Sequence, residues 1–141
     1  MHDSSFAVAL TIAASRFSRA AVLAADTEVA SATWRVASML ATYGPMRPSH
    51  IAHRERTSRA ATTTLLQRLE DEGLICKSVD PSDARAYLVD LTASGRESLS
   101  RWRQRVGLAL DPLVSELPEK DRQTLLRAER LMRSLTDTLE G

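Results

Sequence analysis

Residues 68–92 determine the predicted fold; they read RLEDEGLICKSVDPSDARAYLVDLT. The segment begins with the end of a helix, RLEDEG, in which the glycine is a suitable C′ residue. Two short strands follow, at about residues 74–79 and 85–91, and the polar residues DPSD between them favour a tight turn. A helix followed at once by a two-stranded basic hairpin is the layout of a winged helix, a DNA-binding module. The sequence therefore predicts such a module here.

The remainder of the chain has apolar residues at helical spacing, with turn and capping residues between the segments. Ser31, Thr57 or Ser58, and Thr92 are candidate N-caps, and Pro48 fits the first position of a helix. Asp111-Pro112 is expected to kink or end a long helix early. Residues 26–30 are expected to form a connector, and we expect helices over residues 6–24, 31–43, 48–55, 58–72, 93–115 and 119–139.

The predicted fold is mainly α with a two-stranded β-wing. A winged helix-turn-helix spans about residues 31–92, inside a single domain of residues 1–141. Long helices at both ends, about residues 5–24 and 93–139, are more amphipathic than so small a core requires, so we expect them to form a dimerisation region. A two-fold dimer also matches the symmetry of a palindromic operator. A self-contained helical domain is the competing interpretation.

The composition fits a reducing compartment. With 141 residues and one cysteine, Cys76, the chain allows no internal disulfide, which fits the cytoplasm. No apolar run reaches the roughly 20 residues that span a bilayer, and no secretory signal is evident. The sequence therefore predicts a cytoplasmic protein with no membrane partner.

Charge is distributed unevenly, although the net charge is only +1. Between positions 47 and 68 stand five arginines and a single acid, Glu55. A basic stripe inside a neutral chain is the expected electrostatic footprint of a phosphate-binding face.

The predicted fourth helix carries the candidate recognition face. With its leucines turned inward, its outer face has small, hydroxyl, amide and basic side chains and no acid before Glu70. Such residues contact phosphates and base edges in a major groove. An ordinary surface helix is the alternative. The candidate DNA-binding residues of this region are Thr57, Ser58, Arg59, Ala60, Thr63, Thr64, Gln67 and Arg68.

The hairpin turn contributes two more candidates, Asp83 and Arg85. Arginine is attracted by the negative potential of a narrow minor groove. Asp83 is placed to hold the guanidinium in a bidentate pair. A surface salt bridge within a hairpin explains the same two residues.

Residues 34–75 and the segment after them resemble the MarR family of bacterial transcription regulators. The resemblance rests on an aromatic-Arg-Val start, a Gly-Pro turn, a Pro-Ser-x-hydrophobic-Ala helix, a Thr-rich recognition helix and Arg-Leu-Glu ahead of Gly-Leu-Ile. It also rests on Asp-x-Arg-x5-Leu-Thr and on Leu-Thr-x-x-Gly at residues 91–95. The chain departs from the pattern at Ala84, where many members have arginine, at Ile51, and at Arg47, where a Thr or Ser cap is common.

The resemblance implies a homodimer that binds double-stranded, pseudo-palindromic operator DNA and represses transcription until a small ligand or an oxidant relieves it. It also implies an effector pocket between the dimer helices and the DNA-binding lobe, which Phe17, Trp34 or Trp102 would line. The simpler interpretation places these three aromatic residues and Tyr43 in the core.

Two other features were considered as sites. His50 and His53 share a helix face, but zinc needs three or four ligands and no further ligand stands nearby, so no metal is predicted. Cys76 is interpreted as a buried or half-buried structural thiol, with a redox sensor as the alternative.

The predicted function is sequence-specific DNA binding by a transcriptional regulator. No catalytic triad, phosphate loop or carboxylate pair is visible, so we expect neither an enzyme nor a cofactor. The alternative is a dimeric ligand-sensing or protein-interaction module of the same fold that does not read DNA.

Overall fold

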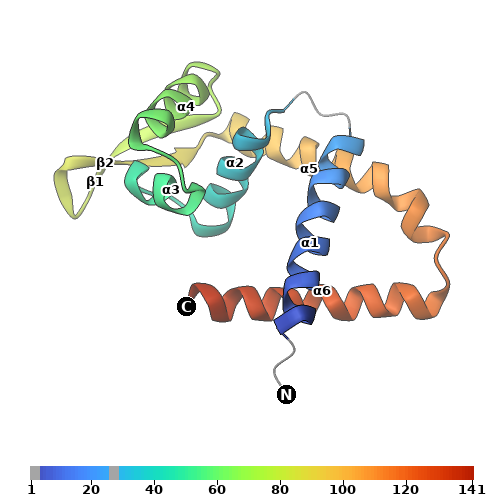
Figure 1. Cartoon of the computed structure of the whole chain (residues 1–141). Coiled ribbons are helices and arrows are strands. Elements are labelled where there is room, and N and C mark those ends of the chain that lie inside the picture. The colour runs from blue at the N-terminus through green and yellow to red at the C-terminus, as the bar shows by residue number, and fades with distance from the viewer. Residues whose placement is uncertain (1–3, 26–28) are drawn as a thin grey trace. The chain divides into compact units, whose positions relative to one another are not determined.

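The computed structural model describes residues 4–25 and 29–141, so the predicted connector lies partly outside the described residues. The chain divides into two compact units (Figure 1). One consists of residues 26–105, and the other joins residues 1–25 to residues 106–141. Each unit is described separately below.

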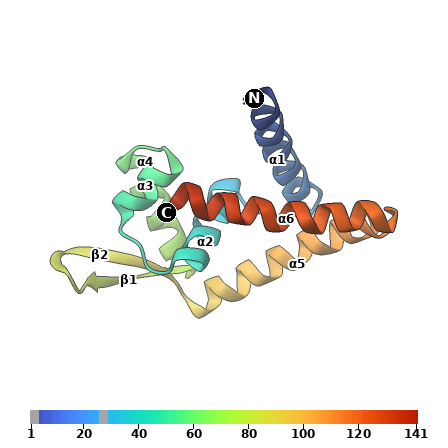
Figure 2. The same ribbon diagram turned by 90° about the horizontal axis from the view of Figure 1, so that it is seen from below.

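The unit of residues 26–105 has the predicted winged-helix order, and the mainly helical fold with one hairpin is confirmed. Each predicted helix of this unit begins and ends within two residues of its observed bounds. In both ribbon views the hairpin extends beyond α3 and α4 (Figures 1 and 2). The elements are α2 (Ser31–Tyr43), α3 (Pro48–Glu55), α4 (Arg59–Asp71), β1 (Ile75–Asp80), β2 (Asp83–Leu91) and the first part of α5 (Ala93–Ser115).

Local capping explains most of the helix boundaries. Pro48 occupies the start of α3, where its missing N–H leaves no helical bond unmade. The Ser58 hydroxyl caps α4 by accepting the Ala61 N–H at 3.0 Å. After α4 the chain turns at Gly73 with a φ of 75°, a backbone conformation that favours glycine. The prediction that Ser31 caps α2 was wrong, because Ala30, whose carbonyl accepts the Trp34 N–H at 3.1 Å, precedes the first turn.

The hairpin is an antiparallel ladder, joined by one extra bridge to the segment before α3. Ile75 faces Leu91, and pairing continues to Val79 opposite Tyr87. On the other side of β2 the backbone of Met46 exchanges hydrogen bonds with that of Val89, at 2.9 and 2.8 Å. The segment that leads into α3 is therefore bonded to the middle of the wing.

Apolar side chains from all elements of this unit form one core. Tyr87, Val89 and Leu91 share a face, as predicted, and the last two are fully buried. On α4 the inward positions are Thr62, Leu66 and Leu69, whereas Leu65 is only half-buried. The core consists of Val36, Ala37, Leu40, Met46, Ile51, Leu66, Leu69, Ile75, Val89, Leu91 and Leu99.

The start of α5 explains the spacing Leu-Thr-x-x-Gly. The Thr92 hydroxyl accepts the Gly95 N–H at 2.9 Å and donates to the Gly73 carbonyl at 2.6 Å, so the predicted cap is confirmed. A Cβ at position 95 would stand 2.1 Å from the carbonyl oxygen of Leu74. The helix therefore crosses the backbone at a distance that only glycine permits.

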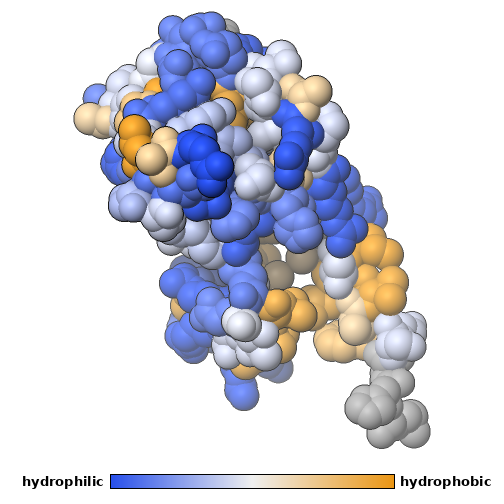
Figure 3. Space-filling view, turned by 90° about the vertical axis from the view of Figure 1, so that its left-hand side faces the viewer, coloured by the Kyte–Doolittle hydropathy of each residue, from blue (hydrophilic) through white to orange (hydrophobic). Residues whose placement is uncertain are grey.

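The second unit contains α1 (Ser4–Ala24), the last part of α5, and α6 (Glu119–Glu140). Its apolar side chains are largely exposed: Ala21 is the only buried residue of α1, and none of α6 is buried. In Figure 3 apolar side chains gather on the helix that follows the grey N-terminal residues, which is α1. The placement of Phe17 and Tyr43 in the core was wrong, since they are 62% and 41% exposed.

Pro112 lies within α5, which continues to Ser115, so of the two expected outcomes, a kink or an early end, the helix does not show the early end. Because Pro112 stands in the last turn, it removes a single helical hydrogen bond and the helix tolerates it.

Among the described residues, one helix is long and apolar enough to cross a membrane by length and composition, although two arginines interrupt its apolar residues. It is α1, with 21 residues and a mean hydropathy of 1.4. Arg16 and Arg19 lie within it, and a charged side chain at the bilayer centre costs about 2.5–3.5 kcal/mol on insertion scales. An amphipathic helix that packs against protein passes the same test, so the observation is weak support for a membrane span.

Candidate nucleic-acid interface

The outer face of α4 presents the predicted recognition residues together. Thr57 and Ser58 lie in the turn before the helix and are exposed, and the Ser58 side chain serves as the cap described above. The candidates on this face of the helix, all exposed, are Arg59, Ala60, Thr63, Thr64 and Gln67. This face has basic, hydroxyl and small side chains that can contact phosphates and base edges.

Hydrogen bonds within α4 determine what these side chains offer to a ligand. The Thr63 hydroxyl donates to the Arg59 carbonyl at 2.9 Å, and that of Thr64 donates to the Ala60 carbonyl at 3.1 Å. Both threonines therefore present a methyl group and an acceptor oxygen. The Gln67 amide donates to Asp71 at 3.0 Å, which fixes its direction along the helix.

Arg68, which was also a candidate, lies apart from the other candidates. Its guanidinium donates to the Thr33 hydroxyl of α2 at 3.1 Å and lies 3.8 Å from the Glu72 carboxylate. Nine positions separate it from Arg59, which places the two arginines on opposite sides of the helix. Arg68 therefore joins α4 to α2 and contributes nothing to the outer face.

The hairpin turn displays Arg85 through a bulge. Asp80 pairs with Asp83 across the turn, while Val79 already pairs with Tyr87. Residues 84–86 of β2 therefore have no partners across the ladder, and Arg85 is the middle one. Its side chain is 95% exposed. Bulges of this kind redirect a side chain out of the ladder, and no feature of the alternation predicted this one.

Asp83 does bind Arg85, but not in the expected bidentate manner. One carboxylate oxygen of Asp83 accepts the Arg85 backbone N–H at 3.0 Å and lies 3.6 Å from its Nε. The backbone bond holds the turn, and the long ion pair leaves the guanidinium free to reach outward.

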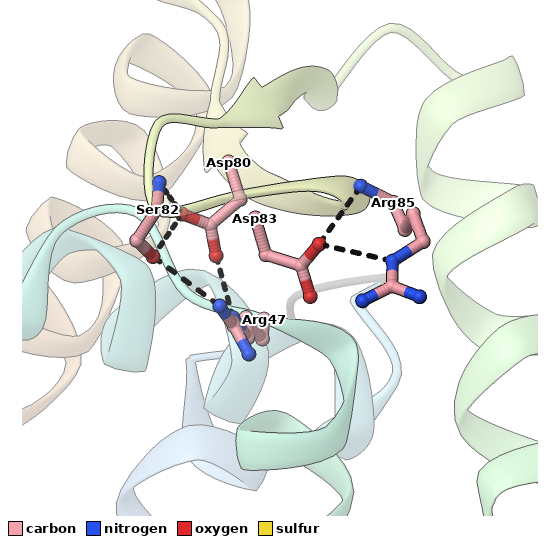
Figure 4. Close-up of polar contacts among 5 residues, drawn as sticks. All are labelled: Arg47, Asp80, Ser82, Asp83 and Arg85. Carbon is pink, nitrogen blue, oxygen red and sulfur yellow. Dashed lines mark hydrogen bonds and ion pairs between the residues drawn. The ribbon is translucent and has the colours of Figure 1, made fainter.

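Arg47 makes a contact that sequence reasoning missed. Its Nε donates to Oδ2 of Asp80 at 2.5 Å, and its Nη2 donates to the Ser82 hydroxyl at 3.3 Å (Figure 4). The Ser82 backbone N–H and hydroxyl, together with Arg47, hold the pKa of Asp80 below its ordinary value. The only signal in the sequence was an arginine where a helix cap was expected.

A groove with a volume of about 320 Å³ lies between the start of α3, α4 and the wing. Three arginines and no acid line it. Thr62 also lines it, and the Thr62 hydroxyl is buried and has no hydrogen-bond partner among the described residues. The groove is lined by Arg47, Pro48, Ser49, Arg59, Thr62, Thr63, Arg85, Ala86 and Tyr87.

The three aromatic residues proposed for a ligand pocket are not brought together within one unit. The rings of Trp34 and Trp102 lie 6.3 Å apart, and Trp102 lines a cavity of about 320 Å³ with Thr33 and Arg68. Phe17 belongs to the other unit.

Histidine and cysteine provide no further site. His50 and His53 are exposed on α3, and the described residues contain no group of three or more metal-binding side chains. Cys76 is exposed on β1, so its interpretation as a buried thiol was wrong. Alternation of the strand turns its side chain away from the core face that carries Ile75.

Comparison with known proteins identifies the family. A model of the MarR family matches residues 31–87, which contain α2, α3, α4 and most of the hairpin. An uncharacterised HTH-type transcriptional regulator of Mycobacterium bovis is 32% identical over 98 residues, covering 70% of this chain and 68% of that protein. The chain belongs to the MarR family. It is a transcriptional regulator with a DNA-binding fold, in a family of DNA-binding transcription factors rather than enzymes.

Solved structures of MarR-like regulators share the fold. The Mycobacterium tuberculosis protein RV1404 superposes with a TM-score of 0.79 at 20% identity, covering 97% of this chain and 96% of that one. A mutant of Staphylococcus aureus MepR, solved bound to an oligodeoxyribonucleotide, superposes with a TM-score of 0.63 at 19% identity, covering 92% and 97%. At these identities the similarity establishes the fold.

Proposed function

We propose that this MarR-family regulator is a cytoplasmic homodimeric repressor that binds a pseudo-palindromic operator. The outer face of α4 would enter the major groove, and Arg85 would reach the adjacent minor groove. The contact residues proposed are those of the prediction, without Arg68, which binds Thr33 instead.

The observation that carries this proposal is the basic groove between α4 and the wing. Arg59 from the helix and Arg85 from the hairpin line the same groove, and no acidic side chain does. A DNA backbone needs such a surface, because phosphate contacts supply most of the affinity and fix the register. The MepR mutant bound to an oligodeoxyribonucleotide has the same fold, which supports this use of the surface.

The dimer is proposed from the unit formed by α1, α6 and the end of α5. Its helices leave Phe6, Phe17 and Leu135 each more than half exposed. Contiguous apolar surface of this kind is rare on a monomer and marks an interface. We propose that residues 31–92 act as the DNA-binding lobe and that helices 5–24 and 93–139 join two copies within one MarR-like domain.

We also propose that a small molecule or an oxidant relieves the repression. The cavity beside Trp102 offers a place for a small effector, and the Trp34 ring contacts Trp102 in a tilted arrangement. Phe17 would take part only if the dimer brings its helix to the cavity.

The competing function is a dimeric ligand-sensing or protein-interaction module that does not read DNA. The cavity beside Trp102 suits either function. The acid-free face of α4 favours DNA, because a protein-interaction surface has no need to exclude acids.

A gel-shift titration with the DNA upstream of the chain's own gene, at two salt concentrations, tests the proposal. A specific complex that weakens steeply with salt is expected, with a stronger complex on upstream DNA than on a shuffled duplex. Equal, weak binding to both duplexes would instead favour the module that does not read DNA.

A further inference from the structure

We infer that Arg47 is a positioning residue of the wing: its ion pair with Asp80 fixes the hairpin turn relative to α3 and so determines where Arg85 points. The inference rests on the proposed DNA-binding function and assigns to Arg47 a role that requires no contact with DNA.

The first step is the state of the Asp80 carboxylate. Asp80 is 5% exposed, although it stands in a hairpin turn. Its Oδ1 accepts the Ser82 N–H at 2.9 Å and the Ser82 hydroxyl at 2.7 Å, and its Oδ2 accepts Arg47 Nε at 2.5 Å. A buried carboxylate is tolerated only when it is paired and hydrogen-bonded. The closed turn therefore depends on Arg47.

The second step is the position of Arg47 in the chain. It follows Met46, whose backbone is bonded to Val89 in the middle of β2, and it precedes the first residue of α3. The same short segment thus holds the wing at two points, at Val89 and at the turn. One point of attachment leaves a hairpin free to pivot, whereas two points fix its direction.

The third step connects the turn to Arg85. The pair with Asp83 is local to the turn and makes no link to the helices (Figure 4). The side chain lies in the bulge directly after the turn. Its direction relative to α4 therefore follows from the position of the turn, which Arg47 holds. Arg47 and Arg85 line one groove with Arg59 of α4, so a small rotation of the turn would change the spacing of the proposed contacts.

The test compares Arg47→Ala, Asp80→Asn and the double variant with wild type and with Arg85→Ala. We expect the first three variants to lose operator affinity by the same factor, roughly tenfold, because each of them removes the same ion pair between Arg47 and Asp80. They should also lose any preference for A·T pairs beside the half-site, as Arg85→Ala should. In the free protein, amide exchange of residues 83–87 should become faster in all three variants.

Arg35→Ala is the matched control. Arg35 pairs with Glu55 at 2.8 Å in the same unit, but this pair joins α2 to α3 and does not touch the wing. The Arg35→Ala variant should therefore leave unchanged both the preference for A·T pairs and the amide exchange of residues 83–87. A thermal melt of every variant establishes that the domain stays folded.

Two results would overturn the inference. If Arg47 contacts phosphate directly, Arg47→Ala should weaken binding and reduce the salt slope by about one, while Asp80→Asn binds as well as wild type or better. If exchange in residues 83–87 is unchanged in Arg47→Ala and Asp80→Asn, the pair does not hold the wing. If the wild type binds no operator, the proposed function fails, and the exchange rates still decide whether Arg47 holds the turn.

Discussion

Single side chains on α4 and the wing differ in how freely they can meet DNA. The Arg59 side chain has no hydrogen-bond or ion-pair partner among those the structure gives for the described part of the chain, and the Arg85 side chain has only the long contact to Asp83. Gln67 is oriented by Asp71, and Arg68 is committed to Thr33. All four residues were predicted as DNA contacts from their residue types. Their hydrogen bonds now show which side chains are free to meet DNA and which are held by other residues of the chain. Which partner an arginine finds depends on segments far away in the chain, and a local pattern does not contain that information.

Arg85→Ala should lower operator affinity and leave the fold intact. The side chain is 95% exposed, and an exposed ion pair such as that with Asp83 contributes only about 0–1 kcal/mol to folding. Fluorescence anisotropy over a salt series should show the slope of log K against log salt reduced by about one unit, if the contact is to phosphate. Asp83→Ala should show a smaller defect. Affinity equal to wild type, or an unfolded domain, would contradict the role given to Arg85.

Arg59→Ala or Gln67→Ala should relax base preference at one operator position, at a cost of about 1–3 kcal/mol. Asp71 uses one N–H of Gln67, which leaves its oxygen and its second N–H for a base edge. Selection from a randomised operator pool measures the preference. Arg68→Ala is the control and should leave the selected sequence unchanged. If both test variants weaken all sequences equally, these residues contact only phosphates.

Elements in this chain are joined by a few close backbone contacts. Thr92 connects the turn after α4 to the start of α5, and the Met46 bridge connects the segment before α3 to the wing. The helices and strands followed from apolar spacing, and the starts of α3 and α4 followed from Pro48 and Ser58, whereas the cap predicted at Ser31 did not form. The bulge at residues 84–86 did not, because it arises from the mismatch between a tight turn and the register of the strands.

Gly95→Ala should destabilise the domain by about 1–3 kcal/mol. Its Cβ would stand 2.1 Å from the Leu74 carbonyl oxygen, so the backbone must shift. Gly107→Ala is the matched control in the same helix: nothing lies within 4 Å of its Cβ, and alanine should stabilise the helix by up to about 1 kcal/mol. Denaturant unfolding of both variants gives the comparison. Equal stability of the two would show that the close crossing at Gly95 relaxes without cost.

At the level of the whole molecule, the two units differ in how they bury apolar surface. Residues 26–105 enclose a core of their own, whereas α6 buries no residue, although leucines recur along it. Helices of this kind need a partner surface, because exposed apolar faces cost free energy in water. The amphipathic pattern predicted this need, and a second copy of the chain is the proposed partner.

Leu135→Lys should weaken the proposed dimer, since it places a charge on the apolar stripe of α6, where Leu135 is 56% exposed in the isolated chain. Sedimentation at micromolar concentration should show monomer for this variant and dimer for wild type. Operator affinity should fall with it, because two recognition helices must meet major grooves about 34–36 Å apart. Ser134→Lys, on the neighbouring polar side of α6, is the control and should remain dimeric. A wild-type protein that sediments only as monomer would exclude the dimer.

The local pattern of the amino-acid sequence was sufficient to predict the winged-helix order, the caps at Ser58 and Thr92, and the acid-free face of α4. Each of these depends on residues within about one or two turns of chain, where spacing and backbone preference act directly. The ion pair between Arg47 and Asp80 and the hydrogen bond from Arg68 to Thr33 join residues that are 33 and 35 positions apart in the chain. Such contacts exist only after the core has brought those segments together, so no spacing rule in the chain could have revealed them.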